Sequence, residues 1–190
     1  MIPDEQRPPE TARALLIVDV QTGFLGPETR HVIAGIERLI PRYAQIIATR
    51  FFNPPGSNFR KLIHWERFDR QGTDFPLAIE LPDHAIIVDK PVYTCVTSAF
   101  LDLLRHHDVS EVHLCGIDTD ICVTKCAVDL FENGLRPVIL GFACASNGGR
   151  ECHEAALKIL VRYIGREQVR ASEISDGQPY SQWEGLHDPG

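Results

Sequence analysis

An unbroken apolar run near the start of the chain constrains the fold most strongly. Residues 14–18 read Ala-Leu-Leu-Ile-Val, and Asp19 follows at once. A strand with one face in water alternates apolar and polar residues, whereas a strand covered by helices on both faces is apolar throughout. The run therefore predicts a buried strand in a parallel sheet.

Similar apolar runs recur along the chain and are separated by segments with helical periodicity. We expect further strands over residues 44–50, 85–90, 111–115, 137–140 and 168–171. We expect helices over residues 31–41 and 98–107, from Cys122 to Gly134, and over residues 151–164. Strands that alternate with helices predict a doubly wound α/β fold in three layers, with helices flanking a mostly parallel sheet. Residues 57–84 show no clear period, and so long a connection is often functional.

The composition limits the class of partner. The 190 residues carry a formal net charge of −7 without a cluster of lysines and arginines, which argues against binding nucleic acid or an anionic membrane. No apolar run reaches the ~18 residues of a membrane span. The polar, proline-rich start of the chain does not read as a signal peptide. A small-molecule substrate is therefore the expected partner.

The number of cysteines indicates the cellular compartment, and the length of the chain indicates the number of domains. Six cysteines without a secretory signal read as reduced thiols, so we expect a cytoplasmic protein. Cys122 and Cys126 are four residues apart, which on a helix is too far for a disulfide. Cys115, Cys126 and Cys144 are expected in the core. Residues 1–190 should form a single domain, with loosely ordered tails at residues 1–11 and 175–190.

Cys122 follows the fourth predicted strand at the start of a helix. Asp118, Thr119 and Asp120 all qualify as N-caps, so Cys122 falls in the first helical turn. Unpaired N–H groups and the positive end of the helix dipole favour a thiolate there and offer an oxyanion hole. Cys122 is therefore a candidate nucleophile. The alternative is a small buried core residue.

Two charged residues end other predicted strands, Asp19 the first and Lys90 the third. Because the carboxyl ends of parallel strands share one edge of the sheet, we expect Asp19, Lys90 and Cys122 to meet there. Asp19 would take the thiol proton, Lys90 would favour the thiolate, and Cys122 would attack a carbonyl. The alternative is a structural ion pair between Asp19 and Lys90, or two separate helix caps.

Three motifs in this order resemble the isochorismatase-like cysteine hydrolases, a group that includes nicotinamidases, N-carbamoylsarcosine amidases and isochorismatases. The motifs are Asp19-Val20-Gln21 followed by Phe24, Lys90 followed by Tyr93, and the run from Gly116 to Cys122. The resemblance covers most of the chain, from Leu15 to about Gly165. It implies a six-stranded parallel sheet in the order 3-2-1-4-5-6.

The resemblance also implies roles for particular residues. An Asp–Lys–Cys triad carries over to Asp19, Lys90 and Cys122, and a cis peptide bond carries over to Ile117–Asp118. The backbone N–H groups of Asp118 and Cys122 would form the oxyanion hole. The family commonly forms dimers or tetramers, so a homo-oligomer is expected.

One departure from the family concerns metal. Nicotinamidase-type members carry a metal site of Asp-x-His character just after the second strand, together with a further histidine. Here residues 49–54 read Thr-Arg-Phe-Phe-Asn-Pro, and His64 stands alone nearby. A single histidine without partner ligands is a poor metal site. We therefore expect no metal and no other cofactor.

These features predict a metal-independent cysteine hydrolase that cleaves a C–N bond of a small amide or ureido-type substrate through a thioester. Family members that act on vinyl ethers generally lack the cysteine, so Cys122 favours acyl cleavage. Candidate substrate-binding residues are Gln21, Phe24, Arg50, Phe51, Trp65 and Tyr93, with the arginine as a clamp for a carboxylate.

Three alternatives stay open. The first is a catalytically silent ligand-binding module of the same fold, and the second is another small-molecule hydrolase of the isochorismatase type. The third is a redox enzyme, which the lack of a well-placed resolving cysteine disfavours.

Overall fold

The strands of the sheet all run parallel. The computed structural model describes residues 12–172. The expected loose tails at residues 1–11 and 175–190 therefore lie outside the described residues. Within residues 12–172, six strands pair in the order β3-β2-β1-β4-β5-β6, which confirms the predicted fold. The strands are β1 (Arg13–Val18), β2 (Gln45–Phe51), β3 (Ile86–Lys90), β4 (Glu111–Ile117), β5 (Arg136–Ala145) and β6 (Val169–Arg170).

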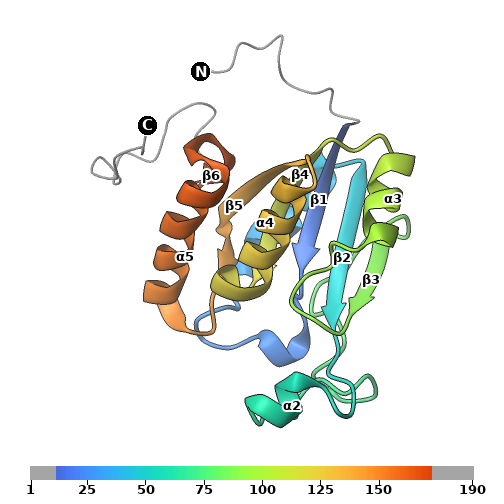
Figure 1. Cartoon of the computed structure of the whole chain (residues 1–190), viewed down its shortest axis with the longest axis vertical. Coiled ribbons are helices and arrows are strands. Elements are labelled where there is room, and N and C mark those ends of the chain that lie inside the picture. Colours follow the sequence, from blue (N-terminus) through green and yellow to red (C-terminus); the bar gives the residue numbers. More distant parts are fainter. Residues whose placement is uncertain (1–11, 173–190) are drawn as a thin grey trace.

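Helices cover both faces of this sheet. They are α1 (Val32–Leu39), α2 (Asn58–Leu62), α3 (Ser98–His106), α4 (Thr124–Glu132) and α5 (Gly149–Ile164). Connections between parallel strands are right-handed, so the direction in which the chain moves along the sheet decides which face a helix covers. The chain moves from β1 toward β3 through α1, which lies on one face. It moves from β3 toward β6 through α3, α4 and α5, which lie on the other face. Figure 1 shows α2 beyond the carboxyl ends of β2 and β3. None of the helices in the described part of the chain is long and apolar enough to cross a membrane.

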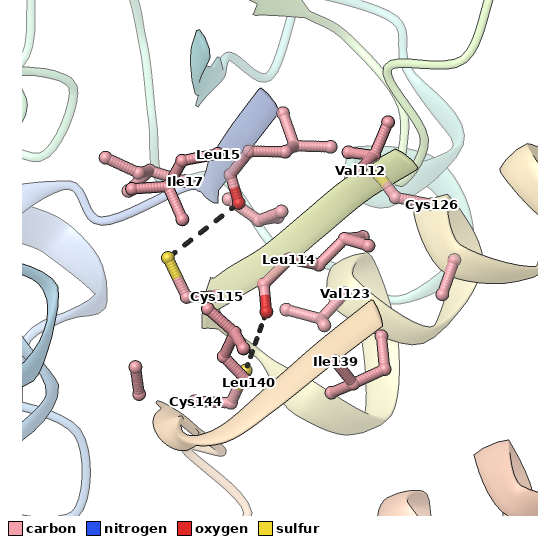
Figure 2. Close-up of a cluster of buried hydrophobic side chains, with 14 of the residues drawn as sticks. Leu15, Ile17, Val112, Leu114, Cys115, Val123, Cys126, Ile139, Leu140 and Cys144 are labelled. Carbon is pink, nitrogen blue, oxygen red and sulfur yellow. Dashed lines mark hydrogen bonds between the residues drawn. The ribbon is translucent and has the colours of Figure 1, made fainter. Parts of the chain in front are cut away.

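The core lies between the central strands and these helices. Residues 14–18 of β1 are fully buried, which agrees with the burial that their apolar run predicts. Figure 2 shows side chains of β1, β4 and β5 gathered with Val123 and Cys126 from the helical side. The buried core therefore packs against the strands whose carboxyl ends lead to the candidate triad residues Asp19, Lys90 and Cys122.

The structure differs from the sequence-based boundaries at β5. The predicted strand ends at Leu140, but β5 continues to Ala145. Gly141 lies inside this strand, where the Arg170 carbonyl oxygen of β6 and the Leu157 side chain of α5 closely approach the position that a Cβ atom would take. A short helix, α2, also lies in the segment that shows no period in the sequence.

Gly116 brings β4 into close contact with β1. It pairs with Val18 and has a φ of +120°, and a Cβ atom at this position would overlap the Val18 backbone. Glycine alone lacks that atom and adopts positive φ freely. Val18 precedes Asp19, and Gly116 precedes the turn that leads to Cys122. The close approach of the two strands therefore sets the spacing between these two residues.

Candidate active site

Asp19, Lys90 and Cys122 meet at the carboxyl edge of the sheet. Lys90 Nζ lies 2.6 Å from Asp19 Oδ2 and 3.5 Å from Cys122 Sγ. A third bond joins Lys90 Nζ to the carbonyl oxygen of Val92 at 3.2 Å. All three side chains are buried, and Cys122 is 6% exposed. The structure thus brings a carboxylate, an ammonium and a thiol into one contact.

Asp19 is held from two sides. Its Oδ2 faces Lys90, while its Oδ1 accepts a hydrogen bond of 2.7 Å from the Thr49 hydroxyl. The residue has a φ of +49°, which is uncommon outside glycine. Thr49 is a residue of the candidate site that sequence reasoning missed, although a polar residue inside the apolar run of β2 is a usable signal.

The electrostatics favour a neutral thiol at rest. Burial raises the pKa of Cys122 well above its ordinary value, and Asp19 raises it further, whereas Lys90 lowers it. Burial lowers the pKa of Lys90, but the negative charge of Asp19, the neighbouring Cys122 and Cys126 and the hydrogen bond to Asp19 together outweigh this effect, so the net pKa of Lys90 is raised. The resting site therefore holds an ion pair beside a thiol.

This protonation state differs from the sequence-based expectation of a thiolate stabilised by a helix start. Cys122 lies in a π-helical turn, Thr119–Val123, and α4 begins only at Thr124. The surrounding apolar layer excludes water, and desolvation outweighs the neighbouring positive charge of Lys90.

The turn before Cys122 contains a cis peptide bond between Ile117 and Asp118. Asp118 Oδ1 accepts hydrogen bonds from the Asn147 backbone N–H at 2.7 Å and from its side-chain Nδ2 at 2.9 Å. Burial raises the pKa of Asp118 to about 6, although both bonds to Asn147 lower it. The carboxyl group of Asp118 is thus engaged by Asn147, a residue that no sequence signal singled out.

Gln21, a predicted substrate-binding residue, has a side-chain amide that is hydrogen-bonded within the protein. Its Nε2 donates to the carbonyl oxygens of Phe51 at 2.9 Å and Phe75 at 2.7 Å. Its Oε1 accepts from the Phe51 N–H at 2.7 Å. Because both amide hydrogens are used, Gln21 joins the ends of β1 and β2 to the long connection and holds Phe51 in place.

Arg50 is not brought to the triad. Its Nε donates to Asp89 Oδ1 at 2.7 Å, and its guanidinium lies 4.5 Å from the ring centroid of Phe75. Side chains alternate along a strand, so Arg50 faces the side of β2 opposite to Thr49 and Phe51. The Arg50 guanidinium thus forms an ion pair with Asp89, and its role as a carboxylate clamp stays a prediction.

An aromatic cluster lies beside the triad. The rings of Phe24 and Phe68 stack at 4.0 Å, and those of Phe51 and Trp65 stack at 5.5 Å. The Phe51 ring centroid is 5.5 Å from Lys90 Nζ, so the cluster reaches the triad. Its other members are Phe59 and Tyr93, whose ring centroids are 5.0 Å apart.

This aromatic cluster also presents ring surface to solvent. Phe24 and Trp65 are half-buried, and Tyr93 is 42% exposed. Phe24, Phe51, Trp65 and Tyr93 were predicted near the site, whereas Phe59 and Phe68 were missed.

The residues after β2 do not fit a metal site. Asn53 Nδ2 donates to the Trp65 carbonyl, and its Oδ1 accepts from the Ser57 hydroxyl, so this amide is already engaged. Phe51, the last residue of β2, packs among Phe59 and Phe68, and His64 is exposed. Across residues 12–172, His, Cys, Asp and Glu side chains form no group of three that could hold a metal ion.

Comparisons with known proteins agree with this architecture. The model of the isochorismatase domain matches residues 13–170. The chain is 37% identical over 81 residues to the uncharacterized isochorismatase family protein PncA of Bacillus subtilis, a match that covers 42% of this chain and only 44% of that relative. It is 31% identical over 155 residues to the nicotinamidase/pyrazinamidase of Mycobacterium tuberculosis, covering 67% of this chain and 83% of the relative.

A solved structure shares the fold. The pyrazinamidase of Pyrococcus horikoshii, in complex with zinc, superposes with a TM-score of 0.73 at 23% identity. The match covers 84% of this chain and 97% of that one.

Proposed function

Because the chain belongs to the isochorismatase family of hydrolases, we propose that it cleaves the C–N bond of a small amide or ureido-type substrate through a thioester on Cys122. The observation that carries the proposal is the Lys90 ammonium, which lies between the Asp19 carboxylate and the Cys122 sulfur. A nucleophile, a base and a fixed charge in mutual contact suit acyl transfer.

In the first half of the reaction, Asp19 accepts the thiol proton as the Cys122 sulfur attacks the substrate carbonyl. Lys90 stabilises the negative charge that the proton transfer leaves on the sulfur. The backbone N–H groups of Asp118 and Cys122 serve as the oxyanion hole. The C–N bond then breaks, and Asp19 returns the proton to the leaving amine.

The second half releases the acyl group. Asp19, again ionised, accepts a proton from water as the water oxygen attacks the thioester carbonyl. The C–S bond breaks, the carboxylic acid departs, and Cys122 regains a proton from Asp19. The raised pKa of Cys122 favours this return of the proton to the sulfur.

Small aromatic primary amides are the first substrates to test. The Mycobacterium tuberculosis relative is named a nicotinamidase/pyrazinamidase. The half-buried rings of Phe24 and Trp65 would pack against a planar ring held beside Cys122. We further propose that no metal takes part, since the segment in which nicotinamidase-type members carry their metal ligands here holds Phe51 and the engaged amide of Asn53.

The test measures ammonia release from nicotinamide, pyrazinamide, benzamide and N-carbamoyl amino acids. Wild type and Cys144→Ala should turn over the same substrate, while Cys122→Ala should fall to background. Cys144 is the matched control because it is also buried but bonds to the Leu114 carbonyl in the core. Rapid quenching should leave an acyl group on the Cys122 peptide.

Two results would contradict the proposal. Equal turnover by wild type and Cys122→Ala would remove Cys122 as nucleophile. Binding without turnover of any panel member, in folded protein, would favour the silent ligand-binding module.

A further inference from the structure

A second pair of thiols lies next to the triad. Cys95 Sγ and Cys126 Sγ are 3.8 Å apart, and the two residues are 2% and 0% exposed. Cys95 belongs to the segment between β3 and α3, a few residues after Lys90. Cys126 lies on α4, one helical turn beyond Cys122. The pair therefore joins the two segments that hold Lys90 and Cys122.

The other core cysteines have different partners. Cys115 Sγ donates to the Leu16 carbonyl and Cys144 Sγ to the Leu114 carbonyl, at 3.8 and 3.9 Å. Figure 2 shows both of these sulfurs well apart from Cys126. Sulfur-to-sulfur contact thus distinguishes Cys95 and Cys126 from Cys115 and Cys144, which bond to backbone carbonyl oxygens.

We propose that Cys95 and Cys126 form a site of reversible oxidation, at which a hydroperoxide closes a disulfide between them. Their sulfurs already touch, so side-chain rotation and a small approach of the two segments bring them to bonding distance. Helical spacing argues only against a disulfide between Cys122 and Cys126. Cys95, the partner of Cys126 here, comes from the segment between β3 and α3.

The chemistry takes place in two steps. The Cys126 thiolate attacks one oxygen of hydrogen peroxide, the O–O bond breaks, and Cys126 becomes a sulfenic acid. The other oxygen leaves as hydroxide and takes up the proton that the Cys126 thiol released, which gives water. The Cys95 thiol then attacks the sulfenic sulfur, the S–O bond breaks, and a second water leaves as the disulfide forms. The two thiols lose two electrons and two protons, and the peroxide is reduced to water.

The order of the steps follows from the surroundings of each sulfur. A hydrogen bond from Cys95 lowers the pKa of Cys126, burial opposes this effect, and the Lys90 ammonium again lowers it. The hydrogen bond to Cys126, together with burial, raises the pKa of Cys95. Burial also raises the pKa of Cys122. Cys126 is therefore the favoured thiolate, and closure of the disulfide spares the proposed nucleophile.

The test treats the native, full-length protein with hydrogen peroxide, blocks remaining thiols after denaturation, and maps the peptides by mass spectrometry. The expected product is a cross-link between the Cys95 and Cys126 peptides that has lost two hydrogens and that a reductant reverses. Because the cross-link restricts the unfolded chain, the oxidised protein should also melt several degrees higher.

Four variants sharpen the result. Cys95→Ala and Cys126→Ala should each abolish the cross-link and the rise in melting temperature. Cys144→Ala and Cys122→Ser should retain both. A cross-link that includes Cys122, or oxidation of Cys126 without a cross-link in wild type, would overturn the proposal. The readout is a peptide and not turnover, so the outcome is independent of the proposed hydrolase activity, and the wild-type map decides even if a variant fails to fold.

Discussion

The hydroxyl of Thr49 bonds to Asp19 at two points. It accepts a hydrogen bond from the Asp19 backbone N–H at 3.1 Å and donates one to Asp19 Oδ1 at 2.7 Å. Thr49 lies on β2, and Asp19 directly follows β1, so these bonds join two neighbouring strands at the edge where the triad lies. One hydroxyl therefore fixes both the backbone and the carboxylate of the proposed base.

Thr49→Val removes this hydroxyl and keeps the shape of the side chain. Each polar group of Asp19 left without its partner should cost about 1–3 kcal/mol in the free energy of unfolding. Turnover should fall about tenfold or more, because a base that is not oriented transfers protons poorly. Thr49→Ser is the matched control and should retain both properties. Chemical denaturation and steady-state kinetics measure them, and unchanged values for the valine variant would show that Lys90 alone orients Asp19.

Lys90→Met tests the charge balance of the triad. The Lys90 ammonium lowers the pKa of Cys122, so its removal should raise that pKa further. The rate of Cys122 alkylation, measured against pH by peptide mapping, reports the change directly. Lys125→Met is the control, since its ammonium pairs with Asp129 on the surface of α4. An alkylation profile that is identical in Lys90→Met and wild type would remove Lys90 from the electrostatics of the nucleophile.

Metal removal should leave turnover unchanged. At the end of β2, Phe51 is packed among aromatic rings and the amide of Asn53 is already hydrogen-bonded. Within residues 12–172, His, Cys, Asp and Glu side chains form no group of three that could hold a metal ion. Exhaustive dialysis against a strong chelator, followed by the ammonia assay and elemental analysis, checks this expectation. A stoichiometric metal ion whose removal abolishes turnover and whose return restores it would contradict the proposal.

Stability should fall below about pH 6.5 because of His113, a buried residue of β4. Its Nε2 lies 2.6 Å from Glu111 Oε1, and its Nδ1 lies 2.5 Å from the Tyr43 hydroxyl. Burial lowers the pKa of His113, Arg170 and Arg13 lower it further, and Glu111 opposes them. The unfolded chain therefore binds the proton more tightly, so this stability is present above the unfolded pKa and is lost as the pH falls toward the folded pKa.

Comparison with His113→Gln isolates this contribution. The free energy of unfolding should decline more steeply in wild type than in the variant between about pH 7 and pH 5.5. Asp118, whose pKa burial raises to about 6, titrates in both proteins and cancels in the difference. Parallel stability profiles for the two proteins would show that His113 is not protonated on unfolding in this range.

The sequence predicted the strands and their shared edge because burial on both faces leaves a plain apolar pattern. Asp19, Lys90 and Cys122 could be singled out as residues at or beyond strand ends, and parallel strands leave these ends on one side. The order of the strands came from the resemblance of the motifs to a family, since apolar runs alone do not specify which strand pairs with which.

Side-chain partners were harder to predict because they depend on residues far along the chain. Arg50 looked available for a substrate until Asp89, 39 residues away, was seen to pair with it. Gln21 similarly bonds to Phe51 and to Phe75, 54 residues away. The raised pKa of Cys122 was also not predicted, because local helix electrostatics can be read from sequence whereas the burial of this one side chain cannot.

The contact between Gly116 and Val18 has a consequence for directed evolution of the site. A saturation library at Gly116 should yield almost only wild-type survivors, since any larger residue forces β1 and β4 apart where they position Asp19 and the turn to Cys122. The partly exposed rings of Trp65 and Tyr93 lie on connections outside the sheet, so their replacement does not force two strands apart. New substrate preferences should therefore arise by exchange of these rings, while the glycine stays invariant in every selected lineage.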